Sequence, residues 1–193
     1  MPLISAPLLA RAPFSELQHK EALTSGVVVS ARHGLSLATL MARKAREATL
    51  ALRVRQHFCV ELPQGPRRVA LGGLAFAGLG PGTWLVARET GEGAHVDELK
   101  AAAEDAASIV DQSDGYAVLR LLGPGARDAL GKLAPVDLDE RAFEVNTVAS
   151  VPLSHVAGVI WRLDDLKDGV PVFEIAVPRS YSEYFWRVLS KSL

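Results

Sequence analysis

The segment from Ser108 to Leu133 constrains the fold most, because two apolar runs, two glycine-containing breaks and a helical pattern follow one another in it. Asp114-Gly115 separates the apolar runs and predicts a hairpin turn, since glycine tolerates the positive φ that such turns need. Gly123-Pro124-Gly125 then ends the second run. Proline fits the first helical position, where its missing N–H costs no hydrogen bond. The segment therefore predicts strand, hairpin, strand and helix.

Strand and helix patterns also alternate along the rest of the chain. Apolar or β-branched runs predict further strands at Gly26–Arg32, Val69–Phe76, Thr83–Arg88, Val148–Leu163 (with Pro152 at an edge or bulge) and Pro171–Val177. Helical spacing predicts a helix capped by Ser36 with apolar residues from Leu37 to Leu52, a second at His95–Ala107, and a last one opened by a capping box at Ser180–Glu183. Asp168-Gly169 predicts a second hairpin.

These patterns favour an α+β fold, with mixed or antiparallel sheets packed by helices, because pure βαβ winding would contain no hairpins. The 193 residues are enough to bury a sizeable core. Residues 1–25 read as an irregular lead-in, and residues 26–193 as a single α+β domain. Trp161 and Trp186 lie in apolar contexts and are predicted to be core residues.

Composition excludes several classes of protein. Net charge is −1, although residues 1–70 are basic and residues 71–145 are acidic, so nothing points to nucleic acid. Hydrophobic residues make up 49%, which favours a subunit of a complex. Val69–Ala87 is uncharged and long enough for a bilayer, but its five glycines and Pro81 argue against a membrane helix. Without a signal-peptide pattern, the chain is expected in the cytoplasm.

No catalytic, cofactor-binding or metal-binding motif is complete. Gly123-x-Gly125 lacks the third glycine of a dinucleotide loop, with Asp128 in its place, so it is interpreted as a structural turn. The five histidines lack metal-site spacing, and His155 is interpreted as a core or edge residue. Cys59 is the only cysteine, so the chain cannot form an intrachain disulfide. Its side chain is predicted to be a small buried hydrophobic residue. We therefore assign no catalytic, cofactor or metal residue.

An interface is the one site that the sequence suggests. The predicted first helix carries a basic face, formed by Arg43, Lys44, Arg46, Arg53 and Arg55. Trp84 follows a Gly-Pro-Gly turn and is predicted to lie on an uncovered apolar patch beside that face. Trp84, Arg43, Arg46 and Arg53 are thus the candidate contact residues. The alternative is that the arginines form an ordinary solvated helix face.

Four segments together resemble the gamma-subunit family of heterotetrameric sarcosine oxidases, itself related to the folate-binding fold of the glycine-cleavage aminomethyltransferases. They are Leu35–Ala45, Gly78–Ala87, Ser108–Leu133 and Val172–Leu189. The resemblance implies a helix in the first and a closing strand and helix in the last. It also implies an architectural subunit without catalytic residues, packed with alpha, beta and delta subunits and chiefly with the large alpha subunit.

In such a complex, sarcosine, oxygen and tetrahydrofolate give glycine, hydrogen peroxide and 5,10-methylenetetrahydrofolate. The resemblance implies that FAD, FMN, NAD, tetrahydrofolate and zinc belong to the partner subunits. Two alternatives stay open. One is a free-standing folate-dependent protein, either aminomethyltransferase-like or an iron–sulfur-assembly relative; Cys59 lies in HFCVE rather than in the Lys-Gly-Cys-Tyr motif of the latter. The other is a pure protein-interaction module.

Overall fold

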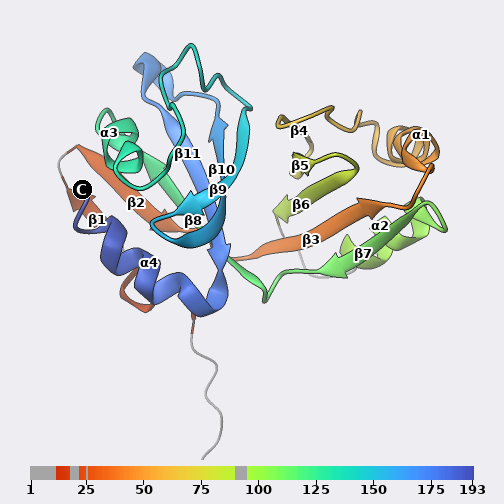
Figure 1. Cartoon of the computed structure of the whole chain (residues 1–193), viewed down its shortest axis with the longest axis horizontal. Coiled ribbons are helices and arrows are strands. Elements are labelled where there is room, and N and C mark those ends of the chain that lie inside the picture. Colours follow the sequence, from red (N-terminus) through yellow and green to blue (C-terminus); the bar gives the residue numbers. More distant parts are fainter. Residues whose placement is uncertain (1–11, 18–21, 25, 90–94) are drawn as a thin grey trace, which may run out of the picture.

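The computed structural model describes residues 12–17, 22–24, 26–89 and 95–193. In this part of the chain, two antiparallel sheets face each other, and each carries two helices on its outer side (Figure 1). The predicted α+β class is confirmed. No helix in the described ranges is long and apolar enough to cross a membrane.

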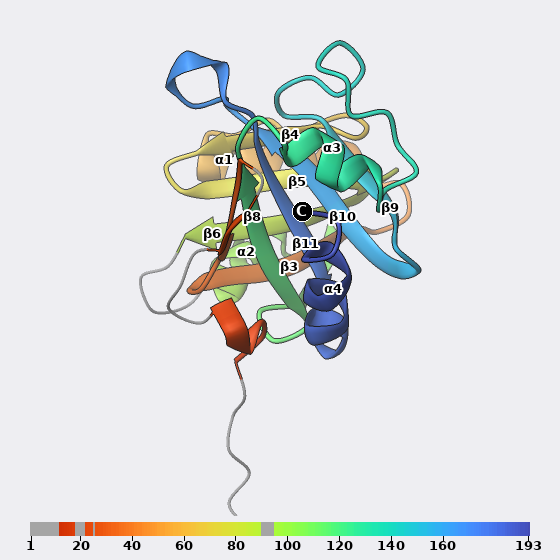
Figure 2. The same ribbon diagram turned by 90° about the vertical axis from the view of Figure 1, so that its left-hand side faces the viewer.

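The first sheet has six strands. Its order is β1 (Ala22–Thr24), β2 (Val27–Ala31), β8 (Tyr116–Leu122), β11 (Val172–Pro178), β10 (Val156–Leu163) and β9 (Val148–Leu153). Helices α3 (Ala126–Gly131) and α4 (Ser182–Leu189) lie over its outer face (Figure 2). The 3₁₀ turns are Ser15–Leu17, Lys167–Gly169 and Arg179–Tyr181.

The second sheet has five strands. Its order is β4 (Arg68–Leu71), β5 (Leu74–Gly80), β6 (Thr83–Glu89), β3 (Leu35–Ala42) and β7 (Ala107–Asp111). Helices α1 (Glu47–Phe58) and α2 (His95–Ala103) cover its outer face. The sheets are joined along one side, where Arg68 N–H donates to Asn146 O at 2.7 Å and Val148 N–H to Pro66 O at 2.8 Å.

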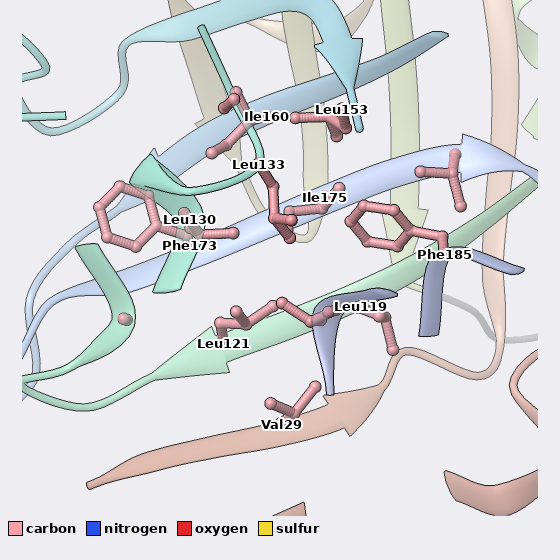
Figure 3. Packing of buried hydrophobic residues seen from close by; sticks show 14 of the residues in the cluster. Val29, Leu119, Leu121, Leu130, Leu133, Leu153, Ile160, Phe173, Ile175 and Phe185 are labelled. Atoms are coloured by element: carbon pink, nitrogen blue, oxygen red, sulfur yellow. The ribbon is translucent and has the colours of Figure 1, made fainter. Parts of the chain in front are cut away.

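Alternation along the strands builds separate cores. Along β8, Leu119 and Leu121 point to the outer core under α3 and α4, whereas Val118 belongs to the core between the sheets. Figure 3 shows the outer core of the six-stranded sheet, including Val29, Leu119, Leu121, Leu130, Leu133, Leu153, Ile160, Phe173, Ile175 and Phe185. Trp161 and Trp186 are both buried, so this prediction is confirmed.

The first predicted helix is wrong in its first half. Leu35–Ala42 is strand β3, hydrogen-bonded to β6 and β7, and Ser36 pairs with Arg88 rather than capping a helix. Helix α1 begins only at Glu47, after Ala45 takes a positive φ of 59°. A strand covered on both faces carries apolar residues on both, so its pattern loses the alternation that distinguishes strand from helix.

The two predicted hairpins have different outcomes. The prediction at Asp114-Gly115 is wrong, because β7 and β8 belong to different sheets and the turn carries the chain from one to the other. Gly115 is not among the positive-φ glycines. The hairpin at Asp168-Gly169 is confirmed: it joins the paired strands β10 and β11, and these two residues have φ values of 73° and 74°.

Other boundaries need correction. The capping box is wrong, because α4 begins at Ser182 without a side-chain cap and the Glu183 carboxylate accepts from the Ser15 backbone N–H at 2.8 Å. Pro124 precedes α3 by two residues, so it is not at the first helical position.

Two residues predicted to be buried or at an edge are exposed. Cys59 is exposed rather than buried, since it ends α1 in a left-handed conformation (φ 56°). His155 is an exposed turn residue between β9 and β10.

The remaining strands are close to prediction. Val148–Leu163 forms β9 and β10, with Pro152 in the edge strand β9, where proline removes no ladder hydrogen bond. Val69–Phe76 overlaps the β4–β5 hairpin. Gly123 has a φ of 131° and lies against the Gly26 carbonyl, which agrees with the structural-turn interpretation. Most of the predicted lead-in, residues 1–25, lies outside the described residues.

Candidate functional site

A cleft of about 250 Å³ opens between the two sheets. We call it the inter-sheet cleft. Its apolar walls come from both sheets and include Leu35, Leu85, Leu163 and the indole of Trp161. Its charged lining consists of Arg32, Arg68, Glu89, Arg120 and Glu174. An apolar pocket with a few convergent charged groups is the usual form of a small-molecule site.

Strand register brings the charged residues together. Arg120 on β8 lies opposite Glu174 on β11, and Glu174 lies opposite Trp161 on β10. Residues directly opposite each other on neighbouring strands point to the same face, so these three side chains form a row facing the other sheet. Arg32 follows the end of β2 and reaches the same row.

Glu174 is the centre of this row. Its side chain is 7% exposed, and its Oε1 accepts from Arg120 Nε at 3.0 Å and Nη2 at 2.7 Å. Arg32 Nε lies 2.8 Å from the same oxygen, and Trp161 Nε1 donates to Oε2 at 3.0 Å. Both carboxylate oxygens are therefore engaged within the chain, as a buried carboxylate requires.

Arg68 contributes a charge from the opposite wall. It starts β4, and its Nη1 donates to Asn146 Oδ1 at 3.3 Å. Burial lowers the pKa of its guanidinium, an effect that the nearby Glu174 carboxylate opposes. Arg32 also pairs with the exposed Glu89. With three arginines and two glutamates, the cleft carries one net positive charge.

The cleft could be anticipated only in part. Arg120 and Glu174 interrupt otherwise apolar strands, and a charge in a buried strand implies a buried partner. The sequence gives no register, so it could not pair them or bring Arg68 to the same cleft. Among the described residues, no three or more His, Cys, Asp or Glu side chains are placed to hold a metal ion.

The structure contradicts the prediction for Trp84. Its side chain is buried, at 5% exposure, on β6 beneath α1. The indole Nε1 donates to Pro63 O at 3.0 Å. The predicted uncovered apolar patch at Trp84 is therefore wrong, because the glycine-rich turn brings the ring into the core rather than to the surface.

The predicted basic helix face is also wrong. Arg43 and Arg46 precede α1. Arg46 and Arg53 both pair with Asp105, and Arg53 also pairs with Glu104 at 2.9 Å. The Arg53 hydrogen bond lowers the pKa of the Asp105 carboxyl below its usual value. Acidic residues distant in sequence thus neutralise two of the three candidate arginines, while Arg43 is exposed.

His95 gives a testable pH dependence outside the cleft. It is 2% exposed, and burial, reinforced by Arg88, lowers its pKa from 6.5 to about 4. The unfolded chain then binds the extra proton, so stability present above pH 6.5 is lost as pH falls towards 4. Between pH 7.5 and 5, the wild type should lose about 2 kcal/mol more of its unfolding free energy than His95→Gln.

Urea unfolding at the two pH values measures this difference. His155→Gln is the matched control, because His155 is exposed. It should keep the wild-type pH dependence, and equal pH dependence in wild type and His95→Gln would refute the expectation.

Comparison with known proteins confirms the resemblance to sarcosine oxidase gamma subunits. The chain is 34% identical over 103 residues to the sarcosine oxidase subunit gamma of Arthrobacter sp., covering 52% of this chain and 51% of that relative. It is 35% identical over 106 residues to the sarcosine oxidase subunit gamma of Corynebacterium sp. strain U-96, covering 53% of this chain and 51% of that relative. The matched region thus spans about half the length of these curated relatives.

Solved structures extend the likeness. A chain of the heterotetrameric sarcosine oxidase from Corynebacterium sp. U-96, in complex with pyrrole 2-carboxylate, matches with a TM-score of 0.76 and 25% identity, over 92% of this chain and 89% of that chain. The glycine cleavage system aminomethyltransferase T from Bartonella henselae shares the fold, with a TM-score of 0.61 and 20% identity. The match covers 85% of this chain and 45% of that chain.

A family model gives the clearest assignment. The model of the GCVT N-terminal domain matches residues 80–192, which is more than half of the chain and runs from the end of β5 through α4. This match, together with the shared fold, shows that the chain belongs to the GCVT N-terminal domain family.

Proposed function

We propose that this chain is the gamma-type subunit of a heterotetrameric sarcosine oxidase and that its role is architectural. The supporting observation is the likeness to a chain of such an enzyme over 92% of one chain and 89% of the other. The complex would oxidise sarcosine to glycine, reduce oxygen to hydrogen peroxide and pass the one-carbon unit to tetrahydrofolate. This chain would pack against alpha, beta and delta subunits, chiefly the large alpha subunit.

The chemistry of the inter-sheet cleft supports a non-catalytic role. A general base or nucleophile needs a group that is free to meet substrate. Glu174 is instead bound by Arg120, Arg32 and Trp161, all from its own chain. We therefore place no catalytic residue in this chain and assign the oxidative steps to the partner subunits.

The residues of the inter-sheet cleft also indicate whether this chain holds tetrahydrofolate itself. The reduced pteridine ring of tetrahydrofolate presents several N–H donors, which need acceptors when buried. In the cleft, the buried acceptor is the Glu174 carboxylate, and its oxygens already accept bonds from Arg120 and Trp161. Because this carboxylate is committed to partners within the chain, we assign tetrahydrofolate, like FAD, FMN, NAD and zinc, to the partner subunits.

Co-expression tests the assembly. The chain is expressed with its candidate flavoprotein and large folate-domain subunits, and the complex is recovered by size exclusion. We expect co-elution, with no sarcosine-dependent peroxide from the chain alone. A wild-type chain that never co-elutes and transfers a one-carbon unit to tetrahydrofolate by itself would favour the free-standing folate-dependent alternative.

Arg43 remains the proposed contact residue, because it is exposed and Arg46 and Arg53 are neutralised within the chain. Arg43→Glu should reduce recovery of the complex, and more strongly at low salt, since exposed charges are screened at higher ionic strength. Arg187→Glu is the control, because Arg187 is exposed on α4 at the opposite outer layer. Equal recovery of the two variants would remove Arg43 from the interface.

A further inference from the structure

The inter-sheet cleft contains a cationic group that the described chain does not neutralise. We propose that this cleft binds a small monocarboxylate with a flat apolar body, whose carboxylate lies at Arg68 and Arg32 and whose body lies against Trp161. This inference does not rest on the proposed assembly, because it follows from the cleft alone.

The argument begins with Arg68. A guanidinium has five N–H donors and no acceptor, and the hydrogen bond found for its side chain is to the neutral Asn146 amide at 3.3 Å. No carboxylate of the described residues lies within ion-pair distance of Arg68, although Glu174 and Glu89 line the same cleft. An uncompensated charge in an apolar setting is costly, and an anionic ligand removes that cost.

Arg32 adds a second donor. Its Nε is buried 2.8 Å from Glu174 Oε1 and its Nη2 pairs with the exposed Glu89, whereas its Nη1 makes no hydrogen bond to the described residues. A guanidinium nitrogen without an acceptor can donate to the carboxylate of a ligand. The cleft therefore offers donors at Arg32 and Arg68, beside a Glu174 carboxylate that already accepts from Arg120 and Trp161.

The volume and net charge of the inter-sheet cleft restrict the chemical class of ligand that it can bind. The volume of about 250 Å³ is smaller than the roughly 300–1,000 Å³ typical of drug-sized ligands, so one ring with one acidic group is the appropriate size. Leu35, Leu85, Leu163 and Trp161 supply apolar contact that a bare phosphate would not use. One negative charge balances the single net positive charge, whereas a cation would meet three arginines.

Calorimetric titration of the full chain with benzoate tests the proposal. Saturable binding is expected for benzoate. Benzamide has the same shape without the charge, and acetate has the charge without the ring, so both should bind at least about tenfold more weakly. Equal affinity for benzamide and benzoate, or no saturation by benzoate, would overturn the proposal.

Arg68→Gln should weaken benzoate binding about tenfold or more. Arg67→Gln is the matched control: Arg67 is the neighbouring residue, but its side chain is 47% exposed and pairs with Glu144 at 3.2 Å. An unchanged affinity in Arg68→Gln would refute the assignment. Should that variant fail to fold, nuclear Overhauser contacts between benzoate and the Trp161 ring in the wild type decide the matter, and their absence at saturation places the ligand elsewhere.

Discussion

Replacing Gly78 by alanine should lower the free energy of unfolding by about 2–4 kcal/mol, at or above the upper end of ordinary overpacking. A Cβ at this position would lie 2.0 Å from the carbonyl oxygen of Gly65. That oxygen cannot simply retreat, because it accepts from Arg67 N–H at 2.9 Å, and Gly78 N–H donates to Arg67 O at 2.9 Å. The alanine must therefore separate two backbone segments that are hydrogen-bonded to each other.

Gly80→Ala is the matched control. Gly80 lies on the same strand, β5, has no positive φ, and a Cβ there would meet nothing within 4 Å. Thermal unfolding should show a midpoint roughly 5–15 °C lower for Gly78→Ala and nearly unchanged for Gly80→Ala. An equal shift in both variants would rule out the close approach to Gly65 as the cause.

The effect should extend to the inter-sheet cleft. Gly78 fixes the position of Arg67, and the next residue is Arg68, whose backbone N–H bonds to Asn146 O across to the other sheet. A displacement of this segment moves the guanidinium of Arg68 relative to Trp161. Gly78→Ala should thus also weaken benzoate binding, whereas Gly80→Ala should not.

Sequence patterns were sufficient where local chemistry decides the structure. The Asp168-Gly169 hairpin was predictable because both residues adopt positive φ in a short connection between paired strands. Asp114-Gly115 carries the same signal but links different sheets, and strand order is not a local property. The segment from Leu35 to Ala42 misled for a related reason, because its two covered faces remove the alternation of an ordinary strand.

The site depended still more on distant pairing. Arg46 and Arg53 are neutralised because α2 and its following turn bring Asp105 to them from more than fifty residues along the chain. The Gly-Pro-Gly turn favours a surface position for Trp84, but the indole N–H donates to Pro63 O, a partner about twenty residues earlier that the local sequence does not indicate. For Glu174, the sequence could indicate a buried charge, but the identity of its partners follows from a register of three strands.

Glu174→Gln should lower the free energy of unfolding by about 2–4 kcal/mol, slightly below the 3–5 kcal/mol typical when one member of a fully buried ion pair is removed. The amide has one acceptor oxygen in place of two, so it cannot serve both Arg120 and Trp161 as the carboxylate does. The cost is moderated because the Arg120 and Arg32 side chains are 29% and 22% exposed and can be partly hydrated. Urea unfolding at pH 7.5 measures the change.

Glu89→Gln is the control, because Glu89 also pairs with Arg32 but its side chain is 65% exposed, and exposed pairs contribute about 0–1 kcal/mol. A double-mutant cycle with Arg120→Gln separates the ion pair from other effects of the amide, and it should give a coupling energy of at least about 1 kcal/mol. Coupling near zero, with Glu174→Gln no more costly than Glu89→Gln, would mean that apolar packing alone holds β8, β11 and β10 in register.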